Sequence, residues 1–349
     1  MIRKSSGRQN NRHESTTVRA PSLLATVVAH VAAFMAMVVV LLSADVAAAA
    51  ERYALIVTGA SGGPEYAQKY DGWRVEFVNT LKEKFGYLPD HLLVLAEEES
   101  AGIKKSTREN VRAAFADLRR RATKDDVVLV LLVGHGSGGE VDEAKFNLVG
   151  PDLGIEEWGS LVRPIAGRVV FVNTASGSFP FLKSAASPGR VVLTATDSPA
   201  QQFETVFPEF FVKAFDDPEA DLDKNGRVSI WEAFTFASDG VRVWFESRGQ
   251  LATERPLLDD TGHGVGREAG TEGPDGTIAQ VTYLQPEPPI VDTGDSELTS
   301  MMRRRAELQT LIEELRARKP NLPPEDYEVE LEKLLLELAR VDRRIRNRS

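Results

Sequence analysis

The chain has 349 residues, a formal net charge of −10 and no cysteine. The missing thiols exclude disulfides, thiolate metal sites and a cysteine nucleophile. The acidic balance makes the chain a poor binder of nucleic acids, so we expect no nucleic-acid partner.

Residues 1–50 have the layout of an export signal. Five basic residues precede an apolar run over residues 23–42 that contains no Lys, Arg, Asp or Glu. The small residues that follow, at 43–50, offer signal peptidase a cleavage site near Ala48 to Ala50. We therefore predict a signal peptide over 1–50 and a periplasmic or secreted protein. The alternative is a retained membrane anchor, because residues 23–42 are long enough to span a bilayer with the rest of the chain outside the cytoplasm.

Beyond residue 51 the sequence alternates between apolar, β-rich segments and helical patterns. Strands are predicted at 53–58, 91–95, 127–133, 168–172 and 190–194. Trp73, Phe77 and Phe85 recur at helical spacing after the first strand. A second helix is expected to open with a capping box of Ser106 and Glu109. This order predicts an α/β fold with a mostly parallel sheet flanked by helices on both faces.

A histidine follows the most apolar of these strands, in the segment Gly134-His-Gly-Ser-Gly-Gly139. In an open parallel sheet, ligands bind in the crevice at the carboxyl ends of the strands. His135 is therefore expected at a ligand-binding position, where an exposed imidazole suits a general base or acid. The alternative is a tight turn that contains an incidental histidine.

Small hydroxyl residues follow a later strand, in the segment 172–179 with the sequence Val-Asn-Thr-Ala-Ser-Gly-Ser-Phe. Adjacent parallel strands would bring Thr174 and Ser176 near His135. A strand that ends in a turn of small residues is a geometry that exposes a nucleophile. The alternative is an ordinary polar turn.

Together these segments resemble the caspase/legumain-like cysteine peptidases of clan CD. The likeness covers about residues 53–215, and it is carried by the opening at 54–62, the histidine loop, the Ser176-Gly177 turn, and the segments 194–198 and 207–210. The resemblance implies a caspase-like sheet, with His135 as the catalytic histidine and a cysteine nucleophile just before the Ser-Gly turn.

The chain departs from this family at two positions of the site. Alignment on Ser176-Gly177 places Thr174 at the position of the nucleophile, and alignment from the strand places Ala175 or Ser176 there. The legumain branch also carries an arginine directly after an aromatic residue of the first loop, and here Ala67 follows Tyr66. Both the nucleophile and a specificity contact are therefore expected to be lost.

Three functions remain open at the level of the sequence. The favoured one is a non-proteolytic pseudoenzyme that binds peptide or protein partners. The second is a hydrolase, a peptidase or esterase, in which Ser176 or Thr174 reacts with His135 as base and the backbone N–H of Gly136 helps to form an oxyanion hole. The third is a purely structural interaction module.

The segment 221–232 fits the EF-hand calcium loop. Gly226 stands at the position of the sharp turn. The predicted calcium ligands are Asp221, Asp223, Asn225, Arg227 through its backbone carbonyl, Ser229 through water, and Glu232. The alternative is a solvated acidic loop without metal. The segment 259–264 resembles a degenerate second loop, but it lacks the later ligands and is assigned no metal.

The remaining sequence divides into a linker and a helical tail. The α/β domain is expected to span 51–267 and to be followed by a linker at 268–295, which shows no sustained period. Residues 296–349 carry two apolar helical patterns separated by Lys319-Pro-Asn-Leu-Pro-Pro324. The second has the spacing of a heptad seam. The tail is therefore predicted to be a helical hairpin that folds onto its own domain, or a coiled coil through which the chain self-associates.

Overall fold

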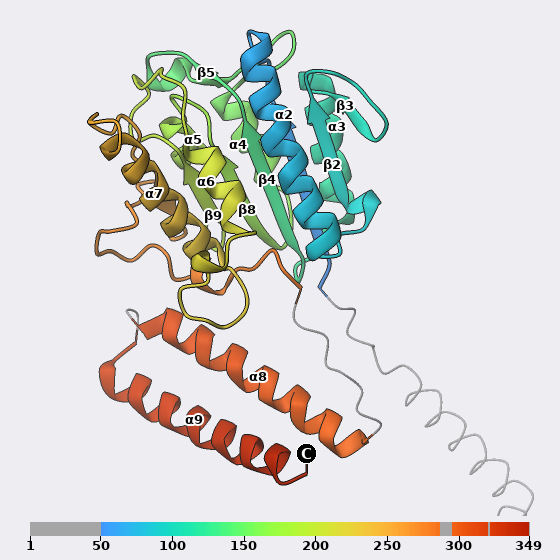
Figure 1. Cartoon of the computed structure of the whole chain (residues 1–349), viewed down its shortest axis with the longest axis vertical. Helices are drawn as coiled ribbons and strands as arrows, with labels where there is room; N and C mark the ends of the chain where they lie inside the picture. The colour runs from blue at the N-terminus through green and yellow to red at the C-terminus, as the bar shows by residue number, and fades with distance from the viewer. Residues whose placement is uncertain (1–49, 287–294, 320–321, 349) are drawn as a thin grey trace, which may run out of the picture. The chain divides into compact units, whose positions relative to one another are not determined.

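The computed structural model describes residues 50–286, 295–319 and 322–348. Its centre is a seven-stranded sheet with the strand order β10-β9-β8-β4-β1-β2-β3 (Figure 1). All neighbouring strands are parallel except β10, which pairs antiparallel with β9. The strands are β1 (Arg52–Thr58), β2 (Leu92–Ala96), β3 (Ile103–Lys105), β4 (Val127–Val133), β8 (Arg168–Asn173), β9 (Val191–Thr194) and β10 (Leu257–Asp259). The predicted α/β fold with a mostly parallel sheet is confirmed.

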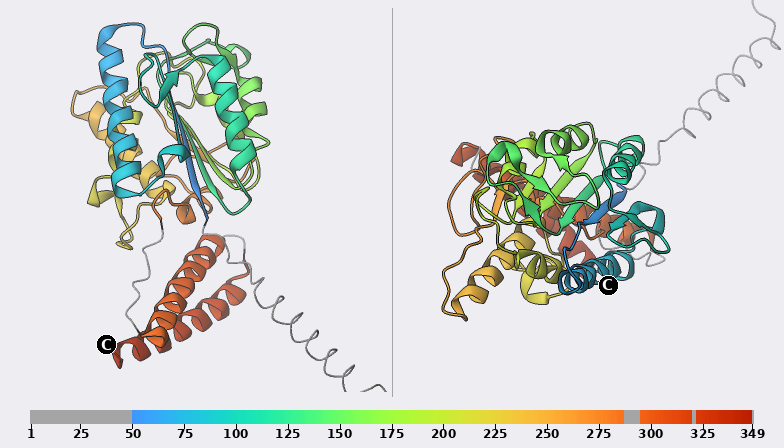
Figure 2. Two further views of the ribbon diagram at one scale, coloured as in Figure 1. Left: turned by 90° about the vertical axis from the view of Figure 1, so that its right-hand side faces the viewer. Right: turned by 90° about the horizontal axis from the view of Figure 1, so that it is seen from above.

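Helices cover both faces of this sheet, as the edge-on view in Figure 2 shows. They are α2 (Pro64–Asn79), which continues into a π-helical turn (Thr80–Lys84), α3 (Arg108–Arg121), α4 (Ile155–Val162), α5 (Phe179–Ala185), α6 (Phe207–Ala214) and α7 (Ile230–Glu246). Short 3-10 turns lie at Pro89–His91, Val141–Glu143, Pro218–Ala220 and Ala279–Val281.

The two faces of the sheet contribute to two separate cores. Successive residues of a strand point to opposite faces, and in β1 Ile56 packs with α2, α6 and α7 whereas Leu55 packs with α3, α4 and α5. All six residues from Tyr53 to Thr58 are nevertheless buried. This burial on both faces explains why the central strands are continuous apolar runs rather than alternating ones.

The register aligns the carboxyl ends of the central strands. Thr58 of β1 pairs with Val133 of β4, and Asn173 of β8 pairs with both Leu132 of β4 and Thr194 of β9. The segments that follow these strands therefore emerge at one edge of the sheet, which we call the carboxyl edge. The residues that precede the strands lie at the opposite edge, the amino edge.

Several local features differ from the sequence expectations. The first residue of α3 is Arg108, and its N-cap is Thr107, whose hydroxyl accepts from the Asn110 N–H. The capping box predicted for Ser106 and Glu109 is therefore wrong by one residue. A small antiparallel sheet of β5 (Gly136–Ser137), β6 (Lys145–Phe146) and β7 (Leu153–Gly154) was not predicted, because strands of two residues carry no periodicity.

The predicted linker at 268–295 is wrong over its first part. Ala279 and Leu284 are fully buried in the core beneath α7. The carboxylate of Asp260 accepts hydrogen bonds from the backbone N–H groups of Gly276, Ile278 and Ala279, which attaches this segment to the end of β10. The domain therefore extends well past residue 267. The rest of the predicted linker, 287–294, lies outside the described residues.

The tail forms two helices, α8 (Ser296–Arg318) and α9 (Pro324–Arg346), that pack against each other. Leu308 of α8 packs with Val341 and Ile345 of α9. The helical hairpin is thus present. One detail differs from the prediction. Leu311 was expected on the apolar face of α8 but is 40% exposed, and Ile312 is buried instead.

Within the described residues, no helix combines the length and the apolar character needed to cross a bilayer. The apolar run of the predicted signal peptide or anchor lies in residues 1–49, outside the part of the chain that the structure describes.

Candidate functional site

His135 lies directly after β4 at the carboxyl edge, and its imidazole is held by two neighbours. Nε2 lies 3.1 Å from the carbonyl oxygen of Ser61, and the Tyr70 hydroxyl lies 3.2 Å from Nδ1 and 3.1 Å from Nε2. The ring of Tyr66 packs edge-on against the imidazole at 4.7 Å between centroids. The loop that carries Ser61 is held in turn by the carboxylate of Glu97, which accepts from the Ser61 N–H.

These contacts define the protonation of the imidazole. A carbonyl oxygen can only accept, so the neutral ring must carry its proton on Nε2 and donate it to Ser61. In this tautomer Nδ1 is the basic nitrogen, and the Tyr70 hydroxyl, which lies at nearly equal distances from both ring nitrogens, is within reach to donate to it. Burial raises the pKa of this hydroxyl, and the negative charge of Glu204 acts in the same direction, so Tyr70 remains a donor at neutral pH. The nitrogen that would act as a general base therefore has the Tyr70 hydroxyl within hydrogen-bond distance.

Ser176 lies beside the histidine loop but bonds to its backbone rather than to the imidazole. The Gly136 N–H donates to Ser176 Oγ over 3.2 Å, and the Ser176 hydroxyl lies 3.3 Å from the Gly136 carbonyl oxygen. The side chain is 3% exposed. The same contact engages the Gly136 N–H that was predicted to serve an oxyanion hole. The close approach also requires glycine, because a Cβ at residue 136 would lie 2.0 Å from the Ser176 carbonyl oxygen.

Thr174 is buried within the sheet. Its hydroxyl donates to the Leu132 carbonyl oxygen over 2.7 Å, and its own carbonyl accepts from the Thr205 hydroxyl. The side chain has no exposed surface. The fold thus brings the segments of His135, Thr174 and Ser176 to one edge, as expected, but within the described residues neither hydroxyl is hydrogen-bonded to the imidazole.

Tyr70 is the partner of His135 that the sequence reasoning missed. Tyr66 and Tyr70 are one turn apart on α2, and both rings contact the imidazole. The signal that could have identified this pair is their i, i+4 spacing on the helix that follows the first strand. The spacing gives no indication of which residue the helix will meet.

The segment 197–206 completes the surface around the histidine. Gln202 Nε2 donates to the Gly138 carbonyl oxygen over 2.8 Å, and Glu204 forms a 2.7 Å ion pair with Lys69 of α2. Between them Phe203 is 70% exposed, an unusual state for a phenylalanine. This segment therefore connects the histidine loop to α2 and presents an aromatic side chain to solvent.

Two amide side chains at this edge retain unused hydrogen-bonding capacity. Asn173 Nδ2 and both polar atoms of the Gln201 amide are buried and have no hydrogen-bond partner in the part of the chain that the structure describes. Buried polar atoms without partners are uncommon in native proteins and call for an explanation. Each of these groups could meet a water molecule or a polar group of a ligand.

A buried carboxylate caps a helix at the same edge. Glu254 is 2% exposed and accepts from the N–H groups of Val206 and Phe207, at the start of α6. Burial raises the pKa of Glu254 to about 7, and the two backbone hydrogen bonds only partly offset this shift. A helix N-terminus stabilises a negative charge, so the start of α6 lowers the free energy of the ionised form of Glu254 in this buried position.

The predicted calcium loop lies between α6 and α7 and has the backbone of a compact, turned loop. Lys224 and Gly226 adopt positive φ values of 59° and 86°. Gly226 is required there because other residues rarely adopt this conformation. Asp221 accepts from the N–H groups of Asn225 and Gly226, which closes the loop around its first carboxylate.

The carboxylates of this loop converge on one point. Oxygen atoms of Asp221, Asp223 and Glu232 lie within 4.8 Å of one another. Glu232 is buried and accepts from the N–H groups of Leu222 and Asp223, while Ser229 caps α7 in a capping box with Glu232. The donor set, three carboxylates with an Asn oxygen and a backbone carbonyl nearby, consists of hard oxygen ligands that suit Ca²⁺.

A second segment pairs with this loop. The Ile230 N–H donates to the Thr282 carbonyl oxygen over 2.9 Å, and Ser229 forms an antiparallel bridge with Tyr283. The neighbour of the loop is therefore the segment 282–283, and not the segment 259–264 that resembles a degenerate second loop. In that segment Asp259 and Asp260 are buried and bonded to backbone N–H groups.

Comparisons with protein-family models and with curated proteins gave no match. Among solved structures, the chain is similar to protein GSU0716 from Geobacter sulfurreducens, with 14% sequence identity and a TM-score of 0.39. The alignment covers 60% of this chain and 92% of that one. A likeness at this level identifies neither a family nor a function.

Proposed function

We propose that this protein is a non-proteolytic, caspase/legumain-like pseudoenzyme that binds peptide or protein partners at the carboxyl edge of its sheet. The observation that carries the proposal is the engagement of every group that would perform hydrolysis. The Tyr70 hydroxyl lies within hydrogen-bond distance of both imidazole nitrogens of His135, and the Ser176 hydroxyl is bonded to the backbone of Gly136.

The alternative of a serine or threonine hydrolase is less well supported. A hydroxyl becomes a useful nucleophile only when a positioned base removes its proton. Ser176 would have to exchange its contacts with Gly136 for His135, and His135 would have to release Tyr70. Thr174 would have to leave the interior of the sheet, where its hydroxyl has no exposed surface.

The surface around His135 favours binding of an extended peptide segment. Phe203 is 70% exposed, and the ring of Tyr66 packs against the imidazole of His135. Aromatic side chains are enriched in protein interfaces, and a few such residues often account for much of the binding energy. The side chain of Gln201 is 8% exposed, and a small shift of its amide would let it bond to a peptide backbone. We infer a partner that combines an apolar side chain with main-chain hydrogen bonds.

Calcium is the metal that best fits the loop at 221–232, and we propose that it stabilises the junction of α6 and α7. Asp221, Asp223, Asn225 and Glu232 would supply side-chain oxygens, Arg227 its backbone carbonyl, and Ser229 a water-mediated contact. Three carboxylates at close range repel one another, and a divalent cation would offset this repulsion. The ion would thus hold the segment that joins the two helices.

We propose that the protein is exported, with residues 1–50 as a signal peptide or with residues 23–42 as a retained anchor. A periplasmic or extracellular location would also provide calcium at the concentrations that a single loop requires.

The tail is proposed to mediate self-association through the outer face of α9. On this face Val329 is 68% exposed and Leu336 is 50% exposed. The first half of α9 is acidic and the second half is basic. In an antiparallel pair of these helices, the acidic half of one copy would therefore face the basic half of the other, on either side of the apolar stripe.

The double variant Val329→Glu and Leu336→Glu is expected to convert the dimer to a monomer in analytical ultracentrifugation. A wild-type chain that is monomeric would contradict the proposal.

The peptide-binding proposal is tested by selecting ligands for the full chain from a displayed library of random peptides. We expect selected peptides to bind the wild-type chain saturably. Phe203→Ser and Tyr66→Ser should each weaken binding at least about tenfold, since aromatic anchors dominate such interfaces. Leu251→Ser is the matched control, because Leu251 is 92% exposed on a different loop. Equal losses in all three variants, or a library that yields no saturable ligand, would reject the proposal.

A further inference from the structure

A buried carboxylate lies at the amino edge, directly before β4. Asp126 is 4% exposed. Its Oδ1 accepts from the backbone N–H of Glu51 over 2.8 Å, and its Oδ2 accepts from the N–H and the hydroxyl of Thr123 over 2.7 and 2.9 Å. Among the described residues Asp126 forms no ion pair, so these three donors are all neutral. Burial of an ionised carboxylate costs free energy that a nearby cation would offset.

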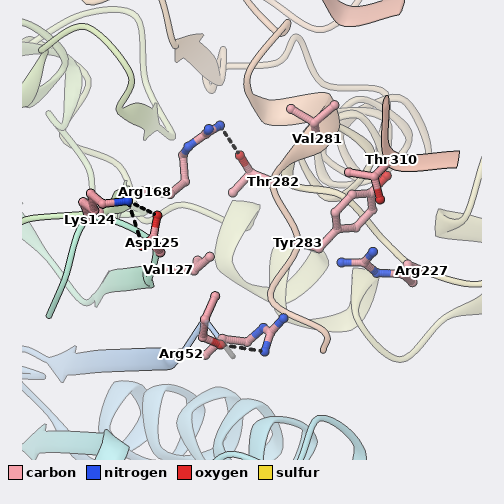
Figure 3. Close-up of a pocket in the computed structure, with 12 residues that line it drawn as sticks. Arg52, Lys124, Asp125, Val127, Arg168, Arg227, Val281, Thr282, Tyr283 and Thr310 are labelled. Carbon is pink, nitrogen blue, oxygen red and sulfur yellow. Dashed lines mark hydrogen bonds and ion pairs between the residues drawn. The ribbon is translucent and has the colours of Figure 1, made fainter. Parts of the chain in front are cut away.

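Glu51 is the first of the described residues that the sheet holds. Its carbonyl oxygen accepts from the Val127 N–H over 3.0 Å, and β1 begins at the next residue, Arg52. Ala50 is exposed, and its carbonyl oxygen accepts a long hydrogen bond of 3.4 Å from Arg52. Figure 3 shows Arg52 and Val127 at this edge. The contact with Asp126 therefore lies at the point where the chain enters the folded domain.

The end of the predicted signal peptide falls at the same point. Signal peptidase prefers small residues at the last position of the signal and two positions before it. Ala50 and Ala48 satisfy this preference, and so do Ala49 and Ala47. The sequence therefore allows more than one cut. The cut after Ala50 differs from the others because it places the new N-terminus on the nitrogen that lies 2.8 Å from Asp126.

We propose that signal peptidase hydrolyses the Ala50–Glu51 bond and that the new α-ammonium group of Glu51 forms an ion pair with Asp126. One water molecule is consumed, the C–N bond breaks, Ala50 keeps the carboxylate, and the amino group of Glu51 takes up a proton. The neutral donor of the present hydrogen bond would thus become a charged one at the same place. Charge-assisted hydrogen bonds are roughly twice as strong as neutral ones. This inference rests on the proposed export of the chain.

The basic side chains that precede Asp126 in the sequence are engaged elsewhere. Lys124 pairs with Asp125 over 2.8 Å, as Figure 3 shows, and Arg121 pairs with Asp90 over 3.0 Å. Neither of them forms an ion pair with Asp126 in the part of the chain that the structure describes. The α-ammonium group of a chain that starts at Glu51 would supply the missing cation.

The cleavage is tested by producing the precursor in a bacterium and determining the first residue of the recovered chain by Edman sequencing and intact mass. We expect Glu51. A chain that begins at any other residue after a cut would overturn this inference and leave the proposed export intact. A chain that keeps residues 1–50 would overturn both this inference and the signal peptide. Protease added to spheroplasts would then show whether the uncleaved chain is exported through a retained anchor.

The ion pair is tested by acylating the α-amino group of the processed chain with acetic anhydride at pH 8 and following the N-terminal peptide by mass spectrometry. A nearby carboxylate favours the protonated amino group, which does not react. Asp126→Asn removes this charge and should raise the acylation rate about tenfold. Asp125→Asn is the matched control, because Asp125 is the adjacent residue and its side chain is 65% exposed. It should keep the wild-type rate.

A second chain guards against loss of folding in Asp126→Asn. A chain that begins at Ala50, released from a fusion protein, moves the α-amino group by one residue and keeps the backbone N–H of Glu51 as a donor to Asp126. It should also react about tenfold faster than the processed chain, while thermal denaturation shows that it is folded. Equal acylation rates in the processed chain, in the chain that begins at Ala50 and in Asp126→Asn would overturn the ion pair.

Discussion

The polar side chains at the two edges of the central sheet differ in how fully the protein itself satisfies their hydrogen bonds. At the carboxyl edge, where enzymes of this architecture hold their substrates, the hydroxyls of Thr174 and Ser176 and the imidazole of His135 bond to the protein itself. At the amino edge, the Nε of Arg52 is buried and has no hydrogen-bond partner in the part of the chain that the structure describes. The groups that resemble catalytic residues are thus bonded to the protein itself, whereas among the described residues the amides of Asn173 and Gln201 at the same edge and the Nε of Arg52 at the opposite edge have no hydrogen-bond partner.

This contrast shows why residue types alone do not define an active site. A histidine, a serine and a glycine N–H lie within one small region of the carboxyl edge, yet the hydrogen bonds link the serine to the glycine. Catalysis depends on which of the possible pairs is formed. The bonds formed by these three residues agree with the proposed non-catalytic role of this edge.

The largest effect is expected from disturbing the contact between the histidine loop and the Ser176 turn. In Gly136→Ala the new Cβ would lie 2.0 Å from the Ser176 carbonyl oxygen. Backbone atoms would have to move, and we expect the free energy of unfolding to fall by about 3 kcal/mol in chemical denaturation. Gly139→Ala is the control, because no atom lies within 4 Å of its Cβ position. Similar losses in the two variants would show that the contact does not hold this edge together.

The next effect concerns calcium. Binding to the folded state alone should raise the free energy of unfolding by about 2.7 kcal/mol when free Ca²⁺ is about one hundred times Kd. Thermal denaturation with and without Ca²⁺ measures this gain, and Asp221→Ala should abolish it. Asp239→Ala, a change of an acidic residue on α7 outside the loop, should keep it. A wild-type chain whose melting temperature does not respond to Ca²⁺ would exclude the calcium site.

A smaller, pH-dependent effect is expected from Glu254. Its pKa of about 7 in the folded state lies above the ordinary value of 4.5, so the folded protein binds this proton more tightly than the unfolded chain. The free energy of unfolding should therefore decrease as the pH rises from about 4.5 to 7, on the order of 2 kcal/mol. Denaturation across this range should give a flatter slope for Glu254→Gln than for the wild type. Glu209→Gln, an exposed change on α6, should keep the wild-type slope.

The elements that the sequence predicted most directly are the central strands, whose side chains contribute to the hydrophobic cores on both faces of the sheet. The strands at 53–58 and 127–133 are continuous apolar runs because both of their faces are buried, and this pattern is local. The strand β10 and the small sheet escaped prediction because two or three residues cannot show a period. The segment 275–284 was taken for linker because its place depends on the carboxylate of Asp260, a contact that the sequence does not reveal.

The candidate site was predicted in its location but not in its bonding. The order of the strands brings residues 135 and 174–176 to one edge, since parallel strands end at the same edge. The partner of His135 was missed, because it depends on how α2 packs over β4. Tyr70 reaches the imidazole from this helix, whereas the Ser176 hydroxyl faces the backbone of Gly136.

The reactivity of Ser176 and Thr174 tests most directly the proposal that the carboxyl edge is non-catalytic. The full chain is treated with a fluorophosphonate probe, and labelled residues are identified by mass spectrometry, while turnover of peptide and ester substrates is followed for the wild type and for His135→Ala. We predict no label on either residue and the same background turnover in both proteins. A label on Ser176 or Thr174 that His135→Ala removes, together with loss of turnover, would contradict this account.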